Sequence, residues 1–189
     1  MQTDKIKRKL IWAGAAAAGV AVGVYFGQRR LADEPVSAPE ANPTPAPSDP
    51  ALKDLWAMEF ELPDGGTFKF SAFKGKPIVL NFWATWCPPC VEELPLLDRF
   101  YRENASKGWQ VVGIAADSAR AVKQFLAKTP FAFPSPLAGL AGVDLSRSLG
   151  NLAGALPFTV VINRQGTVAT RHMGKLSAEQ ISAFASLMG

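Results

Sequence analysis

The chain has 189 residues, of which 48% are hydrophobic and 10% aromatic, and its formal net charge at pH 7 is +4. This composition is typical of a globular protein and excludes full disorder, a collagen-like chain and a disulfide-dense miniprotein. Its two cysteines are too few for a zinc site built from cysteine alone.

The charge is distributed unevenly along the chain. Residues 1–31 hold six bases and one acid, and residues 32–50 hold four acids and no base. The remaining 139 residues balance 14 bases against 11 acids. Because this last part carries only +3 and has no basic run interleaved with aromatic residues, nothing in the sequence favours a nucleic-acid partner.

An apolar segment near the N-terminus has the features of a membrane anchor. Residues 10–26 are 17 residues without a charge, and they follow a basic run that ends at Lys9. A helix from about residue 10 to residue 27 spans roughly 25 Å, near the lower limit for crossing a bilayer. A cleavable signal peptide is the alternative, but Tyr25, Phe26 and Arg29 follow where a cleavage site needs small residues.

We therefore predict that residues 1–31 form a cytoplasmic tail and a single transmembrane anchor, and the positive-inside rule places the later residues outside the cytoplasm. Residues 32–50 contain six prolines and almost no large apolar side chain. Such a segment cannot offset its ordering entropy, which predicts an extended, proline-rich linker. The folded domain is then residues 51–189.

The domain begins with a predicted β-hairpin, formed by residues 59–62 and 67–70 around the turn Pro63-Asp64-Gly65-Gly66. Residues 78–83 are a nearly continuous apolar run, which is typical of a strand covered on both faces. The elements expected after it are a helix over 88–105, a strand over 110–115, a helix over 118–128, a short helix over 143–149, strands over 158–163 and 167–173, and a last helix from a capping box at Ser177 to about 187. This order predicts an α/β fold, with a mixed central sheet between helices.

The strongest chemical signal is the motif Trp86-Cys87-Pro88-Pro89-Cys90, at the junction between a strand and a helix. Two sulfurs three positions apart can close a small disulfide ring, and the helix start favours a thiolate on the first. A purely structural disulfide that encloses two residues would contribute little stability, and a metal site needs more ligands than the single histidine, His172, supplies. The motif therefore favours a redox-active pair that needs no metal and no bound cofactor.

The stretch Asn81-Phe82-Trp83-Ala84-Thr85-Trp86-Cys87-Pro88-Pro89-Cys90 resembles the active site of the membrane-anchored TlpA/ResA-like thiol-disulfide oxidoreductases of the thioredoxin superfamily. The resemblance covers residues 51–189. It implies a thioredoxin-like three-layer sandwich, with an inserted helix and strand at about residues 122–137. It also implies that Cys87 is the exposed nucleophile and that Cys90 is the resolving thiol.

The two prolines of the motif bear on the direction of the reaction. If Cys87 caps the helix, Pro89 has no N–H to offer its sulfur, so the Cys90 amide is the expected donor. A single donor favours a moderately lowered thiol pKa, and hence a reducing enzyme.

Two further residues gain roles from the resemblance. Thioredoxins use a buried acid at the position of Asn81 to help move the proton of the inner thiol, and this chain lacks that acid. The resemblance implies that Glu93, which shares a helix face with Cys90, has the related role here. The alternative is that Glu93 only complements the helix dipole. Pro157 resembles the cis-proline of the family, although an ordinary trans proline remains the alternative. A cis bond would bring the Leu156 backbone beside Cys87, where a substrate peptide can pair.

Trp86 and Pro88, together with Leu156 and Pro157, are expected to form an apolar surface on which the substrate docks. Trp83 is expected to pack around the active-site turn together with Trp86, although packing in the hydrophobic core explains Trp83 equally well. His172 is expected at a surface or strand edge rather than as a ligand.

The function implied is a single-pass protein of the bacterial inner membrane whose catalytic domain faces the periplasm. It would take electrons from a membrane thiol donor of the DsbD/CcdA type and reduce cysteine pairs in exported proteins, as in cytochrome c maturation or copper-site assembly. The alternative is a copper-handling module that uses Cys87, Cys90 and His172, although related copper chaperones usually space their cysteines more widely. A thiol peroxidase would need T-x-x-C, which Thr85-Trp86-Cys87 does not match.

Overall fold

The computed structural model describes residues 50–187. The predicted anchor at residues 10–27 and almost all of the predicted linker lie outside this range. Within residues 50–187, no helix combines the length and apolar character needed to cross a bilayer. In chain order the elements are α2 (Pro50–Leu55), β1 (Glu59–Glu61), β2 (Thr67–Lys69), η1 (Phe70–Phe73), β3 (Ile78–Trp83), α3 (Pro88–Asn104), η2 (Ala105–Lys107), β4 (Gln110–Ala115), α4 (Ala119–Lys128), α5 (Gly139–Ser148), β5 (Phe158–Ile162), β6 (Val168–Met173), α6 (Ala178–Ala183) and η3 (Phe184–Leu187).

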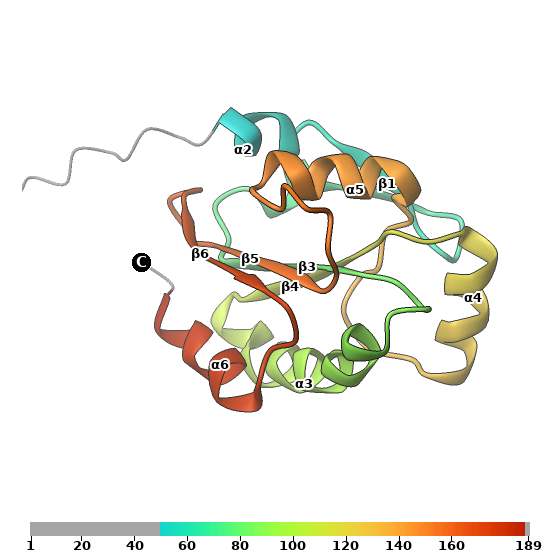
Figure 1. Cartoon of the computed structure of the whole chain (residues 1–189). Helices are drawn as coiled ribbons and strands as arrows, with labels where there is room; N and C mark the ends of the chain where they lie inside the picture. Colours follow the sequence, from blue (N-terminus) through green and yellow to red (C-terminus); the bar gives the residue numbers. More distant parts are fainter. Residues whose placement is uncertain (1–49, 188–189) are drawn as a thin grey trace, which may run out of the picture. The chain divides into compact units, whose positions relative to one another are not determined.

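A four-stranded sheet in the order β4-β3-β5-β6 forms the centre of the domain. β3 pairs with β4 in parallel and with β5 antiparallel, and β6 is an antiparallel edge strand. Helices α3 and α6 cover one face, and α2 and α5 cover the other (Figure 1). The predicted three-layer α/β sandwich with a mixed sheet is therefore confirmed, as is the β1–β2 hairpin. All six residues of β3 are buried, as its continuous apolar run predicted.

The inserted segment at residues 122–137 contains the predicted helix, α4, but the predicted strand was wrong. Only Leu137 forms isolated bridges there. Pro134 and Pro136 explain the difference, because a proline has no N–H to donate to a strand ladder.

At the edge of β4 that faces the insert, side chains donate hydrogen bonds in places where the prolines have no N–H to donate. The Gly113 amide donates to the Pro134 carbonyl at 3.0 Å, as in a parallel ladder. The Gly113 carbonyl accepts instead from the Ser135 hydroxyl at 2.9 Å and from the Trp83 indole at 3.3 Å. These bonds hold the side chain of Trp83, the last residue of β3, which lies three positions before Trp86 at the start of the cysteine motif.

Helix α5 begins at Gly139, four residues before the predicted start. Gly139 and Gly142 have low helix propensity, so the local pattern did not indicate this first turn. The helix packs tightly at Gly142, which compensates for the low helix propensity of glycine. A Cβ added at this position would lie 2.9 Å from the Ala138 Cβ and 3.2 Å from Ile114. The close approach of α5 to β4 therefore requires glycine at position 142.

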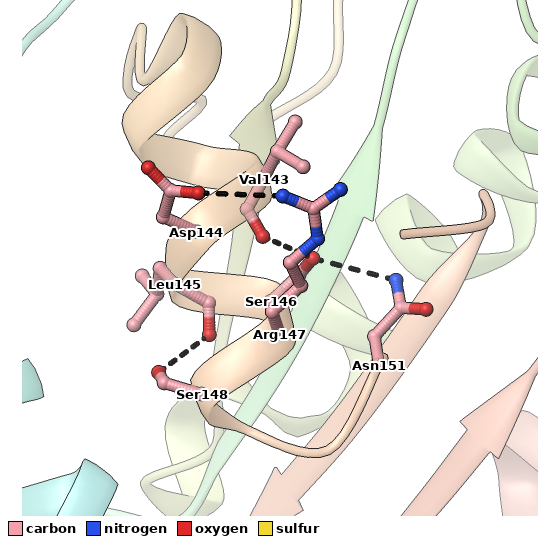
Figure 2. Close-up of polar contacts among 7 residues, drawn as sticks. All are labelled: Val143, Asp144, Leu145, Ser146, Arg147, Ser148 and Asn151. Atoms are coloured by element: carbon pink, nitrogen blue, oxygen red, sulfur yellow. Dashed lines mark hydrogen bonds and ion pairs between the residues drawn. The ribbon is translucent and has the colours of Figure 1, made fainter. Parts of the chain in front are cut away.

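Asn151 organises the loop that leads from α5 to Pro157. Figure 2 shows its Nδ2 directed at Ser146 Oγ, at 3.3 Å, at the end of the helix. Asn151 Nδ2 also donates to the Ala155 carbonyl at 2.8 Å, and its Oδ1 accepts from the Ala155 amide at 3.1 Å. One fully buried side chain thus holds the residues just before Leu156.

Asn151→Ala is expected to lower the free energy of unfolding by about 2–3 kcal/mol, because it removes three hydrogen bonds made by a fully buried side chain. Urea unfolding measures this change. Leu152→Ala is the matched control: Leu152 is 85% exposed, so its loss should change the stability by less than about 0.5 kcal/mol. Equal effects of the two substitutions would contradict the assignment of Asn151.

Candidate active site

The cysteine pair lies where β3 gives way to α3. Cys87 is the N-cap of α3, with extended backbone angles, and its Sγ accepts from the Cys90 amide at 3.3 Å. Pro88 and Pro89 occupy the first two helical positions and have no N–H. The predicted bond from the Cys90 amide to the Cys87 sulfur is therefore confirmed, and among residues 50–187 it is the only hydrogen bond to this sulfur. The two cysteines are joined by a disulfide.

The two cysteines differ slightly in their access to solvent. Cys90 is fully buried, whereas Cys87 is 4% exposed. Cys87 is thus more enclosed than the sequence indicated, because it packs in the core cluster that also contains Ala84 and Leu94. Cys87 is thus the more exposed residue of the pair, though by a small margin.

Asp117, which the sequence analysis did not identify, holds the turn before Cys87. Its carboxylate accepts from the Thr85 amide at 3.0 Å and from the Thr85 hydroxyl at 2.5 Å. It also accepts from the Ser118 amide at 2.6 Å. Burial raises the pKa of Asp117, but the hydrogen bonds from Thr85 and Ser118 outweigh it and hold the pKa below its usual range. The sequence feature that could have indicated this role is the position of Asp117 just after β4, because β4 and β3 are parallel neighbours and end at the same edge of the sheet.

Glu93 lies one turn beyond Cys90, inside the protein. Its side chain is fully buried; Oε1 accepts from Asn81 Nδ2 at 2.7 Å and Oε2 accepts from the Leu176 amide at 2.7 Å. Burial raises the pKa of Glu93 to about 6, against the opposing effect of the bonds from Leu176 and Asn81 and of the nearby Lys175 charge. A carboxyl with this pKa can take up or release a proton near neutral pH.

Asn81 links Glu93 to the rest of the sheet. Its Nδ2 also donates to Thr159 Oγ1, at 3.0 Å. Its Oδ1 is buried, with no hydrogen-bond partner among the described residues. The acid that thioredoxins place at the position of Asn81 is thus replaced by a neutral amide in contact with an acid from α3.

The peptide bond between Leu156 and Pro157 is cis, as predicted. β5 starts immediately after it and pairs antiparallel with β3, so Pro157 lies at the same end of the sheet as the cysteines. Trp86 is 67% exposed and Pro88 is also exposed, whereas Leu156 is partly buried.

His172 does not form a metal-binding cluster with Cys87 and Cys90. It lies on the edge strand β6, opposite Thr159. Among residues 50–187, no group of three His, Cys, Asp or Glu side chains could hold a metal ion. The arrangement therefore does not support the copper-handling alternative.

The burial of Glu93 has a measurable consequence for stability. Because its pKa of about 6 in the folded chain exceeds the ordinary value of 4.5, its contribution is fully present below pH 4.5 and is lost as the pH rises through 6. The wild type should therefore lose about 2 kcal/mol between pH 4 and pH 8 relative to Glu93→Gln, which has no ionisable group at this position. Urea unfolding of both proteins at the two pH values measures this; an unchanged difference would contradict the shifted pKa.

The sequence is similar to those of known proteins. A family model described as Redoxin matches residues 39–187. The chain is 30% identical over 136 residues to the thiol-disulfide oxidoreductase ResA of a Bacillus cereus strain, with 70% of each chain covered. It is 27% identical over 188 residues to the ResA of Halalkalibacterium halodurans, which covers 96% of this chain and 97% of that one.

A solved structure shares the fold. The thiol:disulfide interchange protein of the thioredoxin family from Chlorobium tepidum TLS superposes with a TM-score of 0.63 at 27% identity, covering 70% of this chain and 93% of that one. The family model matches more than half of the chain, and the B. cereus ResA covers 70% of it at 30% identity. The chain therefore belongs to the Redoxin family and is a thiol-disulfide oxidoreductase of the ResA type.

Proposed function

We propose that this oxidoreductase is a reductase, anchored in the inner membrane by residues 10–27 with its catalytic domain in the periplasm, and that it reduces cysteine pairs in exported proteins. The observation that carries the direction is the single amide bond to the Cys87 sulfur. Because both prolines lack an N–H, the helix start stabilises the Cys87 thiolate only moderately. A less stabilised thiolate keeps the pair reducing, since a strongly stabilised reduced form makes an oxidant.

The reaction proceeds in two exchanges. The Cys87 thiolate attacks a substrate disulfide, forms a mixed disulfide and releases one substrate thiolate. The Cys90 thiolate then attacks the Cys87 sulfur, which closes the Cys87–Cys90 disulfide and releases the second substrate thiolate. Two electrons pass from the enzyme pair to the substrate.

Glu93 serves the second exchange in this proposal. Cys90 is fully buried and cannot lose its proton directly to water, while Glu93 follows it by three positions on the same helix face. A carboxylate with a pKa of about 6 is mostly ionised at pH 7 and can accept that proton.

Asn81 suits both protonation states of Glu93. Its amide now donates to the carboxylate, which is the arrangement that an ionised Glu93 requires. If the amide rotates, Oδ1, which has no partner among the described residues, would face a protonated Glu93 and accept its hydrogen bond. A side chain that can offer either a donor or an acceptor is suited to a neighbour that gains and loses a proton.

The substrate docks on the apolar surface of Trp86, Pro88 and Leu156 in this proposal. The exposed indole of Trp86 adjoins Cys87 in the chain, and exposed aromatic side chains are favoured in binding surfaces. Pro157 ends the segment whose backbone would pair with an extended substrate peptide.

Each turnover leaves the pair oxidised, so the enzyme requires a reductant. The periplasm is kept oxidising, and we assign the supply of electrons to a membrane thiol donor of the DsbD/CcdA type. The substrates are exported proteins with cysteine pairs, such as those of cytochrome c maturation or copper-site assembly.

Trapping of mixed disulfides tests this function. Cys90→Ser, expressed as the full chain in its own host, should accumulate disulfide adducts with exported proteins at Cys87, because the second exchange cannot occur. The double variant Cys87→Ser/Cys90→Ser is the control and should trap none. Adducts found only with cytoplasmic proteins, or none at all, would contradict the proposal.

A further inference from the structure

The segment Gly174-Lys175-Leu176, between β6 and α6, connects two parts of the active site through its backbone. The Gly174 amide donates to the carbonyl of Pro157 at 2.9 Å. Two residues later, the Leu176 amide donates to Glu93 Oε2 at 2.7 Å. One short segment therefore ties the cis-proline to the buried carboxyl of α3.

Lys175, between these two amides, holds the same helix from outside. Its Nζ forms an ion pair with Glu92 Oε2 on α3. The side chains are 46% and 58% exposed, respectively. Because Glu92 directly precedes Glu93, the exposed ion pair and the buried amide bond fasten the segment to the same turn of α3.

The two attachments differ in how easily they open. The Leu176 amide reaches a fully buried carboxyl, and Leu176 itself is buried. The Lys175–Glu92 pair is in contact with solvent, so it is the weaker and more accessible attachment. Without the pair, the backbone bonds to Pro157 and Glu93 would hold the segment with less support from α3, so the Leu176 amide would be positioned less firmly on Glu93.

We propose that Lys175 is a positioning residue for disulfide exchange: its pairing with Glu92 keeps the segment on α3, so that the Leu176 amide stays on Glu93 while Cys90 transfers its proton. The proposal rests on the proton-accepting role of Glu93 proposed above. The Lys175 charge supports it in addition, because it lowers the pKa of Glu93 and so favours the ionised, proton-accepting form.

Other groups around Glu93 must stay unchanged in a test of this proposal. The elements packed around Glu93 carry other titratable or charged side chains, among them Cys90 and Glu92 on α3, Arg171 and His172 on β6 and Glu179 on α6, while Asn81 on β3 and Thr159 on β5 are neutral. Lys175→Met replaces none of these side chains and retains most of the aliphatic stem, so its direct effect is the loss of the Lys175 charge and of the ion pair with Glu92.

The test follows the rate of insulin-disulfide reduction by the full chain between pH 5 and pH 9. Lys175→Met and Glu92→Gln should each slow the reaction at pH 7 by about two- to fivefold, the range expected for loss of an exposed ion pair. Lys175→Met should also move the acidic midpoint of the pH profile to higher pH. The exchanged pair Lys175→Glu/Glu92→Lys should recover the wild-type rate to within about twofold, since it restores the ion pair. Lys123→Met, at an exposed site on α4, is the charge-matched control and should change neither quantity.

Two results separate this proposal from the one on which it rests. If Glu93→Gln reduces insulin at the wild-type rate, the role of Glu93 fails, and this proposal fails with it. If Glu93→Gln is slow, Lys175→Met should cause no further loss in the Glu93→Gln background, because both act on one proton transfer. An equal loss in both backgrounds, or an unchanged pH midpoint in Lys175→Met, would overturn the role of Lys175 alone.

Discussion

Cys87→Ser is expected to abolish disulfide reduction, leaving less than about one thousandth of the wild-type rate with insulin as substrate. Cys87 is the more exposed residue of the pair, and we assign the first attack to it. A serine hydroxyl is not ionised at neutral pH and cannot replace the thiolate. The measurement is the rate of insulin reduction, with dithiothreitol as the source of electrons.

Cys90→Ser is the matched comparison, because it removes the second sulfur and keeps the first. This variant should still react once and form a mixed disulfide, but it should not turn over. The order of attack would be contradicted if Cys90→Ser turned over normally, or if a substrate became linked to Cys90 in the Cys87→Ser protein.

Glu93→Gln is expected to slow insulin reduction at pH 7 by about 10- to 100-fold, since glutamine cannot accept the proton of Cys90. The wild-type rate should fall as the pH drops through about 6, where Glu93 becomes protonated, and the variant should lack the part of the decrease that this protonation causes. Glu103→Gln is the control, an exposed acid on the same helix, and should retain the wild-type profile. A Glu93→Gln enzyme with the wild-type rate and pH profile would show that Glu93 serves only the structure.

Local patterns in the sequence predicted the framework of the active site. The apolar run of β3 predicted a buried central strand, and the missing N–H of Pro89 predicted the single amide bond to Cys87. The cis bond before Pro157 was also predictable, but only from the resemblance to a family. These features depend on neighbouring residues or on a short motif, which a single sequence displays directly.

The residues that complete the site were not predictable in the same way. Asp117 meets Thr85 across 32 positions of the chain, and Leu176 meets Glu93 across 83. Such contacts arise when β4 pairs with β3 and β6 pairs with β5, and no periodicity in the sequence predicts them. The predicted strand in the insert was wrong for a different reason: the resemblance to the family implied it, while Pro134 and Pro136 lack the N–H donors that its ladder required.

The reduction potential of the Cys87–Cys90 pair tests the proposed direction of electron flow most directly. Equilibration of the full chain with glutathione or dithiothreitol buffers, followed by alkylation of free thiols, gives this potential. The single amide bond at Cys87 predicts a value near that of thioredoxin, about −270 mV. A value near about −120 mV, that of a strong oxidant, would contradict a reductase.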